Sequence, residues 1–290
     1  MYDITAVAEN TDAIDDAALA DIADLVRGGD VLVLSGAGLS TESGIPDYRG
    51  PTGVLRNSLP MTYQTFTRDP LARRRYWARS QLGWRHLMDA EPNLGHSAVA
   101  ELEALGALTG IVTQNVDGLH QAGGARSVVE LHGSVDRVVC IRCGDRTPRS
   151  VLSERLRAAN PAWEASAAAV NPDGDVSLAE ADLERFRIVD CRRCAGMLKP
   201  DVIFFGENVP PVTVELCYRL VDRCRSMLVL GSSLTVMSGL RFVRRAAASG
   251  RPVAIVTQGV TRADELASIK VDLPLGETLR GLVDSVARQR

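Results

Sequence analysis

Short, continuous apolar runs recur along the chain, and each is bounded by glycine or polar residues. They are about four residues long and rich in valine, isoleucine and leucine. Continuous apolar runs of this length are typical of strands that are buried on both faces, as in a parallel sheet. The strands predicted in this way cover residues 31–34, 110–113, 128–131, 227–230, 253–256 and 269–271.

Apolar residues with helical spacing lie between many of these runs. The segment before Gly106 begins at Ser97, which is predicted as its N-cap, and the glycine marks its end. Strands that alternate with helices favour the α/β class, with a doubly wound, Rossmann-like parallel sheet. The helices predicted from this spacing cover residues 12–27, 97–105 and 236–249.

Two stretches interrupt the alternation. Residues 46–93 begin as a polar loop and become an arginine-rich helical region, and residues 140–205 contain two cysteine pairs around an alanine-rich segment. A chain of 290 residues is longer than one small core requires, so we interpret both stretches as insertions into one larger domain. The predicted division is a nucleotide-binding domain of residues 1–45, 94–139 and 206–290, a loop and helical insertion of residues 46–93, and a small cysteine-containing module of residues 140–205.

The charge balance is nearly neutral, with 33 basic and 36 acidic residues and a net charge of -3. This composition predicts no nucleic-acid partner. No apolar run reaches the ~18 residues that a transmembrane helix requires, and the first residues lack the pattern of a signal peptide. We therefore expect a cytoplasmic protein without membrane association. In a reducing compartment, paired cysteines favour metal binding over disulfides.

Two Cys-x-x-Cys pairs lie in the small module. Each pair can offer two thiolates to one tetrahedral ion, and a site of four thiolates has no open coordination position. The pattern predicts one structural Zn²⁺ that holds the module together; two redox-active dithiols are the alternative. The predicted ligands are Cys140, Cys143, Cys191 and Cys194.

The first apolar run leads into a glycine turn, Gly36-Ala37-Gly38. Glycine allows a backbone to approach a pyrophosphate, and a helix that follows would supply N–H donors. The fingerprint of dehydrogenases requires Gly or Ala where Thr41 stands, and an acidic residue at the end of a second strand. Since a polar loop replaces that strand, the turn indicates dinucleotide binding without hydride transfer.

Polar residues crowd the ends of two other predicted strands. Gln114, Asn115 and Asp117 follow the run that ends at residue 113, and His132 follows the next run. In α/β sheets, ligands bind at the carboxyl ends of the strands. A neutral imidazole at that place could act as a general base near pH 7, although a structural histidine is an equally good interpretation of His132 from these residues alone.

The ordered set of motifs resembles the sirtuin family over nearly the whole chain, from about residue 24. The matching segments are residues 36–49, 113–117, 131–133, the two cysteine pairs, 199–207 and 231–234. Residues 76–79 and 172–176 look like the class II branch, which includes a mitochondrial member in animals, and the chain resembles its bacterial members.

The resemblance implies that NAD is a co-substrate held between the large domain and the zinc module. The residues that it assigns to NAD binding are Gly36, Ala37, Gly38, Thr41, Ile45, Pro46, Asp47, Tyr48, Arg49, Gln114, Asn115, Asp117, Gly231, Ser232, Ser233, Thr257, Gln258, Gly259 and Leu275. Ile45 and Asp117 would bind the nicotinamide carboxamide, and Tyr48 would shield the exposed sugar carbon. Thr257 stands where the family usually has asparagine.

The resemblance also implies the reaction. The amide oxygen of an acyl-lysine attacks the ribose as nicotinamide leaves, which gives an alkylimidate. His132 then takes a proton from the ribose hydroxyls, with Asn115 as the second catalytic residue. The expected products are nicotinamide, free lysine and O-acyl-ADP-ribose, and the expected partners are acylated proteins or peptides.

The substrate peptide is expected to enter as an extended strand between the loop of residues 234–239 and the segment of residues 202–205, with Val202, Ile203 and Phe204, because backbone pairing gives affinity without strict sequence demands. A buried strand is the alternative interpretation of that segment. Tyr76 and Arg79 are spaced to share one helix face, as in a sirtuin branch that grips acidic acyl groups. A solvated arginine-rich helix is the alternative for this pair.

Four other interpretations compete with deacylation. Mono-ADP-ribosyl transfer to proteins and lipoamidase activity could use the same scaffold. A catalytically silent NAD-binding module would not need His132, Asn115 or Asp117. A dehydrogenase is disfavoured by the departures of the glycine turn described above.

Overall fold

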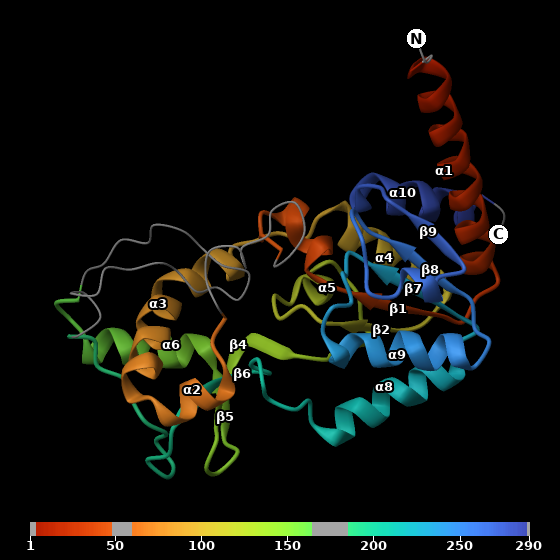
Figure 1. Cartoon of the computed structure of the whole chain (residues 1–290). Helices are drawn as coiled ribbons and strands as arrows, with labels where there is room; N and C mark the ends of the chain where they lie inside the picture. The colour runs from red at the N-terminus through yellow and green to blue at the C-terminus, as the bar shows by residue number, and fades with distance from the viewer. Residues whose placement is uncertain (1–3, 48–59, 164–184, 289–290) are drawn as a thin grey trace.

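A computed structural model describes residues 4–47, 60–163 and 185–288, and its larger part is built on a six-stranded parallel sheet (Figure 1). The strand order is β3-β2-β1-β7-β8-β9, and every neighbouring pair is parallel. The strands are β1 (Val31–Ser35), β2 (Leu108–Thr113), β3 (Val128–Glu130), β7 (Ser226–Leu230), β8 (Val253–Val256) and β9 (Ile269–Val271). Each apolar run that predicted a strand contributes to this sheet, so the predicted α/β class is confirmed.

Helices cover both faces of the sheet, as a doubly wound fold requires (Figure 1). Val33 of β1 packs into the core under α1, α4 and α10, whereas its neighbours Leu32 and Leu34 pack on the opposite face under α8 and α9. This alternation explains why the strands are apolar at every position. The helices are α1 (Ile4–Arg27), α4 (Leu94–Ala104), α8 (Pro211–Arg223), α9 (Met237–Ala248) and α10 (Leu275–Ala287).

The predicted start of α4 was wrong. Asn93, and not Ser97, is the N-cap, since its side chain accepts hydrogen bonds from the amides of Gly95 (2.9 Å) and His96 (3.2 Å). The ring of His96 accepts from the Asn93 amide at 3.3 Å and closes a capping box. A histidine in this position was not recognised in the sequence, because the usual partner is Glu or Gln.

The smaller part combines both predicted insertions. Its antiparallel sheet has the order β5-β4-β6 and is formed by β4 (Gly133–Cys140), β5 (Arg146–Pro148) and β6 (Leu198–Val202). The helices α2 (Tyr63–Arg68), α3 (Pro70–Met88) and α6 (Arg149–Ala159) lie against it (Figure 1). Phe66 and Tyr76 from the first insertion share one core with Leu152 and Leu198 from the second. The two insertions therefore pack as one unit around β4, which begins upstream of Cys140.

Arg149 ties α6 to α3 inside this unit. Its guanidinium lies 5.4 Å from the ring centre of Trp77 and 5.0 Å from that of Trp84, and it donates to the carbonyl of Ser80 at 3.2 Å. Burial lowers the pKa of Arg149 to about 10, which still leaves the side chain protonated at neutral pH. Cation–π contacts and carbonyl acceptors thus compensate the desolvated charge.

Three short helical turns complete the described elements: η1 (Ala37–Ser43), α5 (Leu119–Ala122) and η2 (Asp264–Leu266). Among the described residues, no helix has both the length and the apolar character needed to cross a membrane.

Candidate active site

The carboxyl ends of β1 and β7 lie where the order of the large sheet reverses. From β1 the chain builds outward through β2 and β3, and then returns to the opposite side of β1 with β7. A crevice opens at such a switch point because the loops after the two strands leave in opposite directions. The loop after β1 and the loop that begins at Gly231 border this crevice.

Glycines let these two loops touch. A Cβ atom on Gly36 would lie 2.8 Å from the Cβ of Ser232, and one on Gly38 would lie 2.9 Å from the Cα of Gly231. The amide of Gly36 donates to the carbonyl of Leu230 at 2.9 Å, and that of Gly38 to the carbonyl of Gly231 at 2.8 Å. The glycine turn therefore joins two loops besides lining the crevice. It leads into the 3₁₀ turn η1 rather than into an α-helix.

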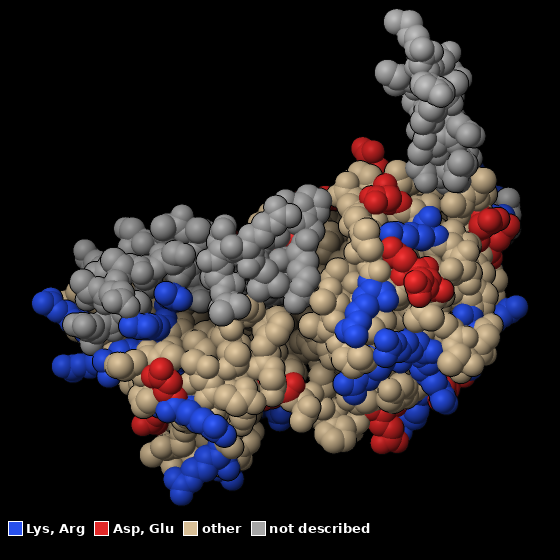
Figure 2. Space-filling view, viewed as in Figure 1, with Lys and Arg blue, Asp and Glu red and all other residues tan. Residues whose placement is uncertain are grey.

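A cavity of about 800 Å³ occupies the crevice and extends to the smaller part. The surface where the larger and smaller parts meet is largely uncharged in the view of Figure 2. Most residues assigned to NAD by resemblance line this cavity: Gly36, Ala37, Gly38, Thr41, Ile45, Asp47, Gln114, Asn115, Asp117, Gly231, Ser232, Ser233, Thr257, Gln258, Gly259 and Leu275. Pro46 is not among the lining residues, and Tyr48 and Arg49 lie outside the described residues. The individual contacts with NAD stay predictions.

The edge of β6 reaches the same cavity. Val202, Ile203 and Phe204 line it on one side, and the segment from Leu234 to Ser238 lines it on another. The two segments on which the predicted peptide site depends therefore face one space. Leu234 has a φ of 53°, which is unusual for a residue with a branched side chain. Strained backbone of this kind clusters at functional sites.

Tyr76 and Arg79 do not reach the cavity. Tyr76 is only 3% exposed, and its ring packs edge-on against Phe66 (5.4 Å) and Phe204 (5.3 Å). Neither Tyr76 nor Arg79 is among the described residues that line the cavity. The structure thus gives the predicted grip on acidic acyl groups no support, because an aromatic residue at this helical position packs into the core instead.

A polar triad sits at the base of the cavity beside η1. The Nδ2 atom of Asn115 donates to the Ser40 Oγ at 3.0 Å, and this hydroxyl donates to the Asp117 Oδ2 at 2.7 Å. The other carboxylate oxygen of Asp117 accepts from the Leu119 amide at 3.0 Å. Burial raises the pKa of Asp117, and these two donors oppose the shift. Asn115 and Asp117 are thus held with polar atoms beside the cavity, which suits recognition of a carboxamide.

His132 lies at the junction of the two parts of the molecule. Its Nδ1 atom is 3.0 Å from the carbonyl oxygen of Gln114, and its Nε2 atom is 2.8 Å from the Ser238 Oγ. Burial lowers the pKa of His132, while the bond to the Gln114 carbonyl opposes this shift. The imidazole is therefore neutral at pH 7, and neutral imidazole is the form that can take up a proton.

Two further histidines are buried behind the polar triad of Ser40, Asn115 and Asp117. His96 is 0% and His120 is 1% exposed, and their rings meet edge-on with centroids 5.3 Å apart. The Nε2 of His120 lies 2.8 Å from the Ser35 Oγ, which in turn donates to the Thr113 Oγ1 at 2.9 Å. Burial lowers the pKa of His96 to about 3 and that of His120 to about 4. Both rings are neutral supports of the strand ends.

The four predicted cysteine ligands converge. Their sulfur atoms all lie within 4.8 Å of one another, with 3.5 Å between Cys140 and Cys194 and 3.9 Å between Cys143 and Cys191. Tetrahedral Zn–S bonds of about 2.3 Å would place the sulfurs about 3.8 Å apart. The donor set and its geometry therefore fit one structural Zn²⁺, as predicted.

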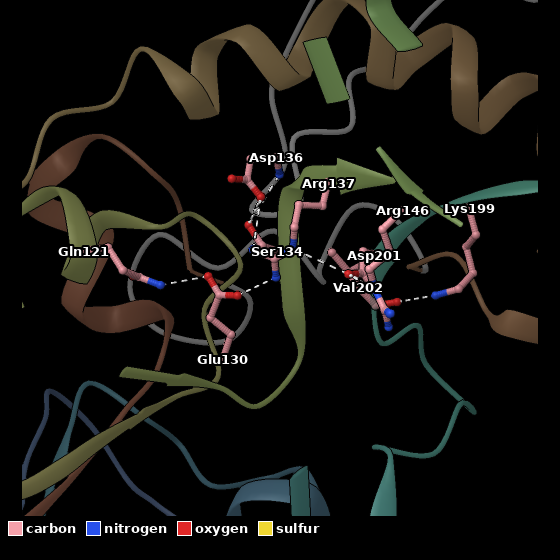
Figure 3. Close-up of polar contacts among 9 residues, drawn as sticks. All are labelled: Gln121, Glu130, Ser134, Asp136, Arg137, Arg146, Lys199, Asp201 and Val202. Carbon is pink, nitrogen blue, oxygen red and sulfur yellow. Dashed lines mark hydrogen bonds and ion pairs between the residues drawn. The ribbon is translucent and has the colours of Figure 1, made fainter. Parts of the chain in front are cut away.

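Ion pairs lie where the larger sheet meets the smaller one (Figure 3). Arg137 of β4 pairs with Glu130 at the end of β3 and lies 3.5 Å from Asp201 of β6. Arg146 of β5 lies 3.0 Å from the same Asp201 carboxylate. The pair of Arg137 with Glu130 therefore joins the two sheets across the segment that carries His132, whereas the pairs with Asp201 connect strands within the smaller sheet.

Sequence reasoning missed several residues of the site. Ser40 bridges Asn115 and Asp117, and Ser238 contacts His132. The Glu42 Oε1 accepts from the Gly276 amide at 3.0 Å and attaches α10 to η1. Serines carry little signal of their own in a sequence. Ser40 and Glu42, however, stand inside the glycine motif, and that position could have identified them.

Comparisons with known proteins agree with this geometry. The sequence pattern described as the Sir2 family matches residues 36–238. A protein of Streptomyces coelicolor called NAD-dependent protein deacetylase 1 is 60% identical over 92% of this chain and 89% of its own length. A bovine protein called NAD-dependent protein lipoamidase sirtuin-4, mitochondrial, is 46% identical over 86% of this chain and 80% of its own length.

The chain belongs to the Sir2 family. A solved Sir2 structure described in terms of mechanism and regulation superimposes with a TM-score of 0.76 at 31% identity, and it covers 95% of this chain and 100% of its own. A complex of Sir2 with a p53 peptide and NAD⁺ superimposes with a TM-score of 0.74 at 29% identity, over 92% of this chain and 98% of its own.

Proposed function

We propose that this Sir2-family chain is an NAD-dependent protein deacetylase that releases nicotinamide, O-acyl-ADP-ribose and free lysine. One observation supports this function above the others. A single cavity is lined by the glycine loops at the switch point, by the polar triad of Ser40, Asn115 and Asp117, and by His132. The relatives that are called NAD-dependent protein deacetylases, at 47–60% identity, support the same activity.

The residues present fit NAD. Glycines 36 and 38 leave the loop after β1 without side chains at the cavity, and Ser232 and Ser233 place hydroxyls beside it. Asp117 and Asn115 offer a carboxylate and an amide to the nicotinamide carboxamide. NAD supplies, when it is bound, an ADP-ribosyl group whose glycosidic bond to nicotinamide can be replaced by a bond to the acyl oxygen of the substrate.

His132 acts as the general base. Its neutral ring lines the cavity and is held by hydrogen bonds at both nitrogens, so it can take a proton from a hydroxyl that is bound there. Asn115, fixed by Ser40 and by the carbonyl of Gly36 at 3.1 Å, orients ligands at the floor of the cavity. Asp117 selects the carboxamide through its carboxylate.

The substrate peptide binds in extended form between Ile203 and Leu234, which belong to the two segments that line the cavity on different sides. A peptide that pairs through its backbone places its acyl-lysine toward His132 with little dependence on sequence. The amide of Ile203 already donates to the His132 carbonyl at 2.8 Å. This bond ties the position of the peptide-binding edge to that of the general base.

Lipoamidase activity is the second candidate, because the bovine relative at 46% identity carries that name. Acetyl-lysine is the preferred substrate in our proposal, since the bacterial relatives are called deacetylases. Mono-ADP-ribosyl transfer would use the same bound NAD without acyl transfer. The cytoplasmic location stays a prediction from the sequence.

One assay tests the proposal and separates these activities. The chain is incubated with NAD and matched peptides that carry acetyl-, succinyl-, glutaryl- or lipoyl-lysine, and the products are identified by mass spectrometry. We expect nicotinamide, free lysine peptide and O-acetyl-ADP-ribose. The fastest turnover with lipoyl peptide would favour lipoamidase activity, and ADP-ribosylated protein without acyl transfer would contradict deacetylation.

The His132→Ala variant tests the role of the base. We expect deacetylation to fall by about 10² to 10⁴, the usual contribution of general acid–base catalysis. Exchange of labelled nicotinamide into NAD should persist, because that step does not need the base. Full deacetylation by the variant would refute the role of His132.

A further inference from the structure

Ser238 lies in the first turn of α9 and reaches across the cavity to the imidazole. Its Oγ is 2.8 Å from the Nε2 of His132, which is 106 residues away in the chain. No side chain caps the start of α9, and Ser238 lines the cavity. The hydroxyl is thus directed toward the general base rather than toward the helix end.

The partner at Nδ1 decides which proton the ring carries. Nδ1 lies 3.0 Å from the Gln114 carbonyl oxygen, which can only accept a hydrogen bond. The neutral ring therefore has its hydrogen on Nδ1, and Nε2 accepts a hydrogen bond from the Ser238 hydroxyl. The nitrogen that must take up the proton is the one that contacts Ser238.

The backbone holds both partners of the ring in fixed relation. A Cβ on Gly239, the residue after Ser238, would lie 2.7 Å from the Gln114 Oε1. The Gln114 side chain donates in turn to the Ser232 Oγ at 2.8 Å. The start of α9 is therefore packed directly on Gln114, so that the hydroxyl and the carbonyl that contact the imidazole move together.

We propose that Ser238 is a positioning residue for His132: its hydroxyl fixes the orientation of the imidazole beside the cavity and then accepts a hydrogen bond from the Nε2–H group when the ring becomes charged. This inference rests on the proposed function. The balance is simple, since the Ser238 hydroxyl first rotates its hydrogen away from the Nε2 lone pair, and a ligand hydroxyl then gives its proton to that lone pair. Ser238 keeps its own hydrogen, and a lone pair of its oxygen accepts a hydrogen bond from the new N–H. The ring later returns the proton, and Ser238 resumes its role as donor.

No charged side chain among the described residues forms a hydrogen bond or ion pair with the imidazole in place of Ser238. Within the described part of the chain, the charged residues that line the cavity are Glu42, Asp47, Asp117, Glu207 and Arg241. Glu207 is paired with Lys199 at 3.0 Å, and Asp117 is held by the Ser40 hydroxyl. Glu130 and Asp136, which flank His132 in sequence, pair with Arg137. Among the described residues, the polar contacts of the ring are those to Gln114 and Ser238.

The first experiment measures the ring itself in the ligand-free protein. The chain has four histidines, so ¹⁵N NMR titration can follow each of them, and His132 is assigned from the signal that the His132→Gln variant lacks. A hydrogen bond to charged imidazolium is stronger than one to the neutral ring. Ser238→Ala should therefore move the His132 midpoint to lower pH and leave the proton of the neutral ring on Nδ1.

Ser249→Ala is the matched control, because Ser249 is exposed at the opposite end of α9. We expect its His132 midpoint to equal that of the unmodified chain. An unchanged midpoint in Ser238→Ala would overturn the inference, even if the rate fell, because a residue that only fills space does not alter proton affinity. Ser238→Thr keeps the hydroxyl and should restore the midpoint.

The second experiment separates the two halves of the reaction. Deacetylation by Ser238→Ala should slow about tenfold, the effect of losing one hydrogen bond to a charged group. Nicotinamide exchange should stay within about twofold of the unmodified chain. If the unmodified chain neither exchanges nicotinamide nor deacetylates, the proposed function fails. If it does both and Ser238→Ala deacetylates equally fast, only the role of Ser238 fails.

Discussion

Replacement of Gly133 by alanine would force apart the strands that position His132. Gly133 follows the general base directly, has a φ of 80°, and pairs with Val202 of β6. A Cβ atom there would lie 1.9 Å from the Asp201 carbonyl oxygen and 3.0 Å from the Val202 Cα. Both contacts are with backbone, so no side-chain rotation relieves them, and β4 must separate from β6 by about 1 Å.

Three effects contribute to the cost. A left-handed conformation at a residue with a Cβ costs about 1 kcal/mol. The bond from the Ile203 amide to the His132 carbonyl, now 2.8 Å, would be lost at about 1 kcal/mol. Overpacking of the strands adds about 1–3 kcal/mol. Gly133→Ala should therefore lower the free energy of unfolding by about 3–5 kcal/mol.

Gly106→Ala is the matched control. Gly106 also has a left-handed φ, of 69°, but a Cβ there would meet nothing within 4 Å. Its expected cost is only the conformational cost of about 1 kcal/mol. Equilibrium unfolding in urea compares the two variants, and deacetylation should fall about 100-fold in Gly133→Ala because the base is displaced. Equal stability of the two variants would refute the steric argument.

Two further predictions concern the supports of the site. Because the pKa values of His96 and His120 in the fold are about 3 and about 4, the unfolded chain takes up protons first as pH falls below about 6.5. The contribution of the two neutral rings to the free energy of unfolding is then fully present above that pH, and it falls by about 1.4 kcal/mol per pH unit for each ring between pH 6 and 4.5. His120→Gln should reduce this pH dependence of the free energy of unfolding, measured by urea titration at several pH values. An unchanged pH dependence would contradict the burial of a neutral ring. Cys191→Ser should lose the bound Zn²⁺ and have a lower Tm, because it removes one of four predicted ligands. The control variant Cys217→Ala should keep about one zinc per chain by elemental analysis. Full zinc content in Cys191→Ser would exclude the four-thiolate site.

The amino-acid sequence by itself determined the large sheet. Its strands are apolar at every position because helices cover both faces, and that local pattern is readable without knowledge of the fold. The cysteine pairs were equally informative, since four thiolates in two close pairs suit one tetrahedral ion. The cavity-lining loops were also predicted, because Gly36 and Gly231 belong to motifs that can be recognised locally.

Only the tertiary structure decided how these parts meet. Phe66 and Leu152 belong to insertions that are far apart in the sequence, yet they share one core. Tyr76 has a spacing that would suit a ligand-binding face, but its ring is packed against Phe204 instead. One of the two partners of the His132 ring is Ser238, which comes from α9 and is 106 residues away in the chain. Each of these contacts joins segments through space, and a local pattern of residue types contains no information about which distant side chain will fill a given gap.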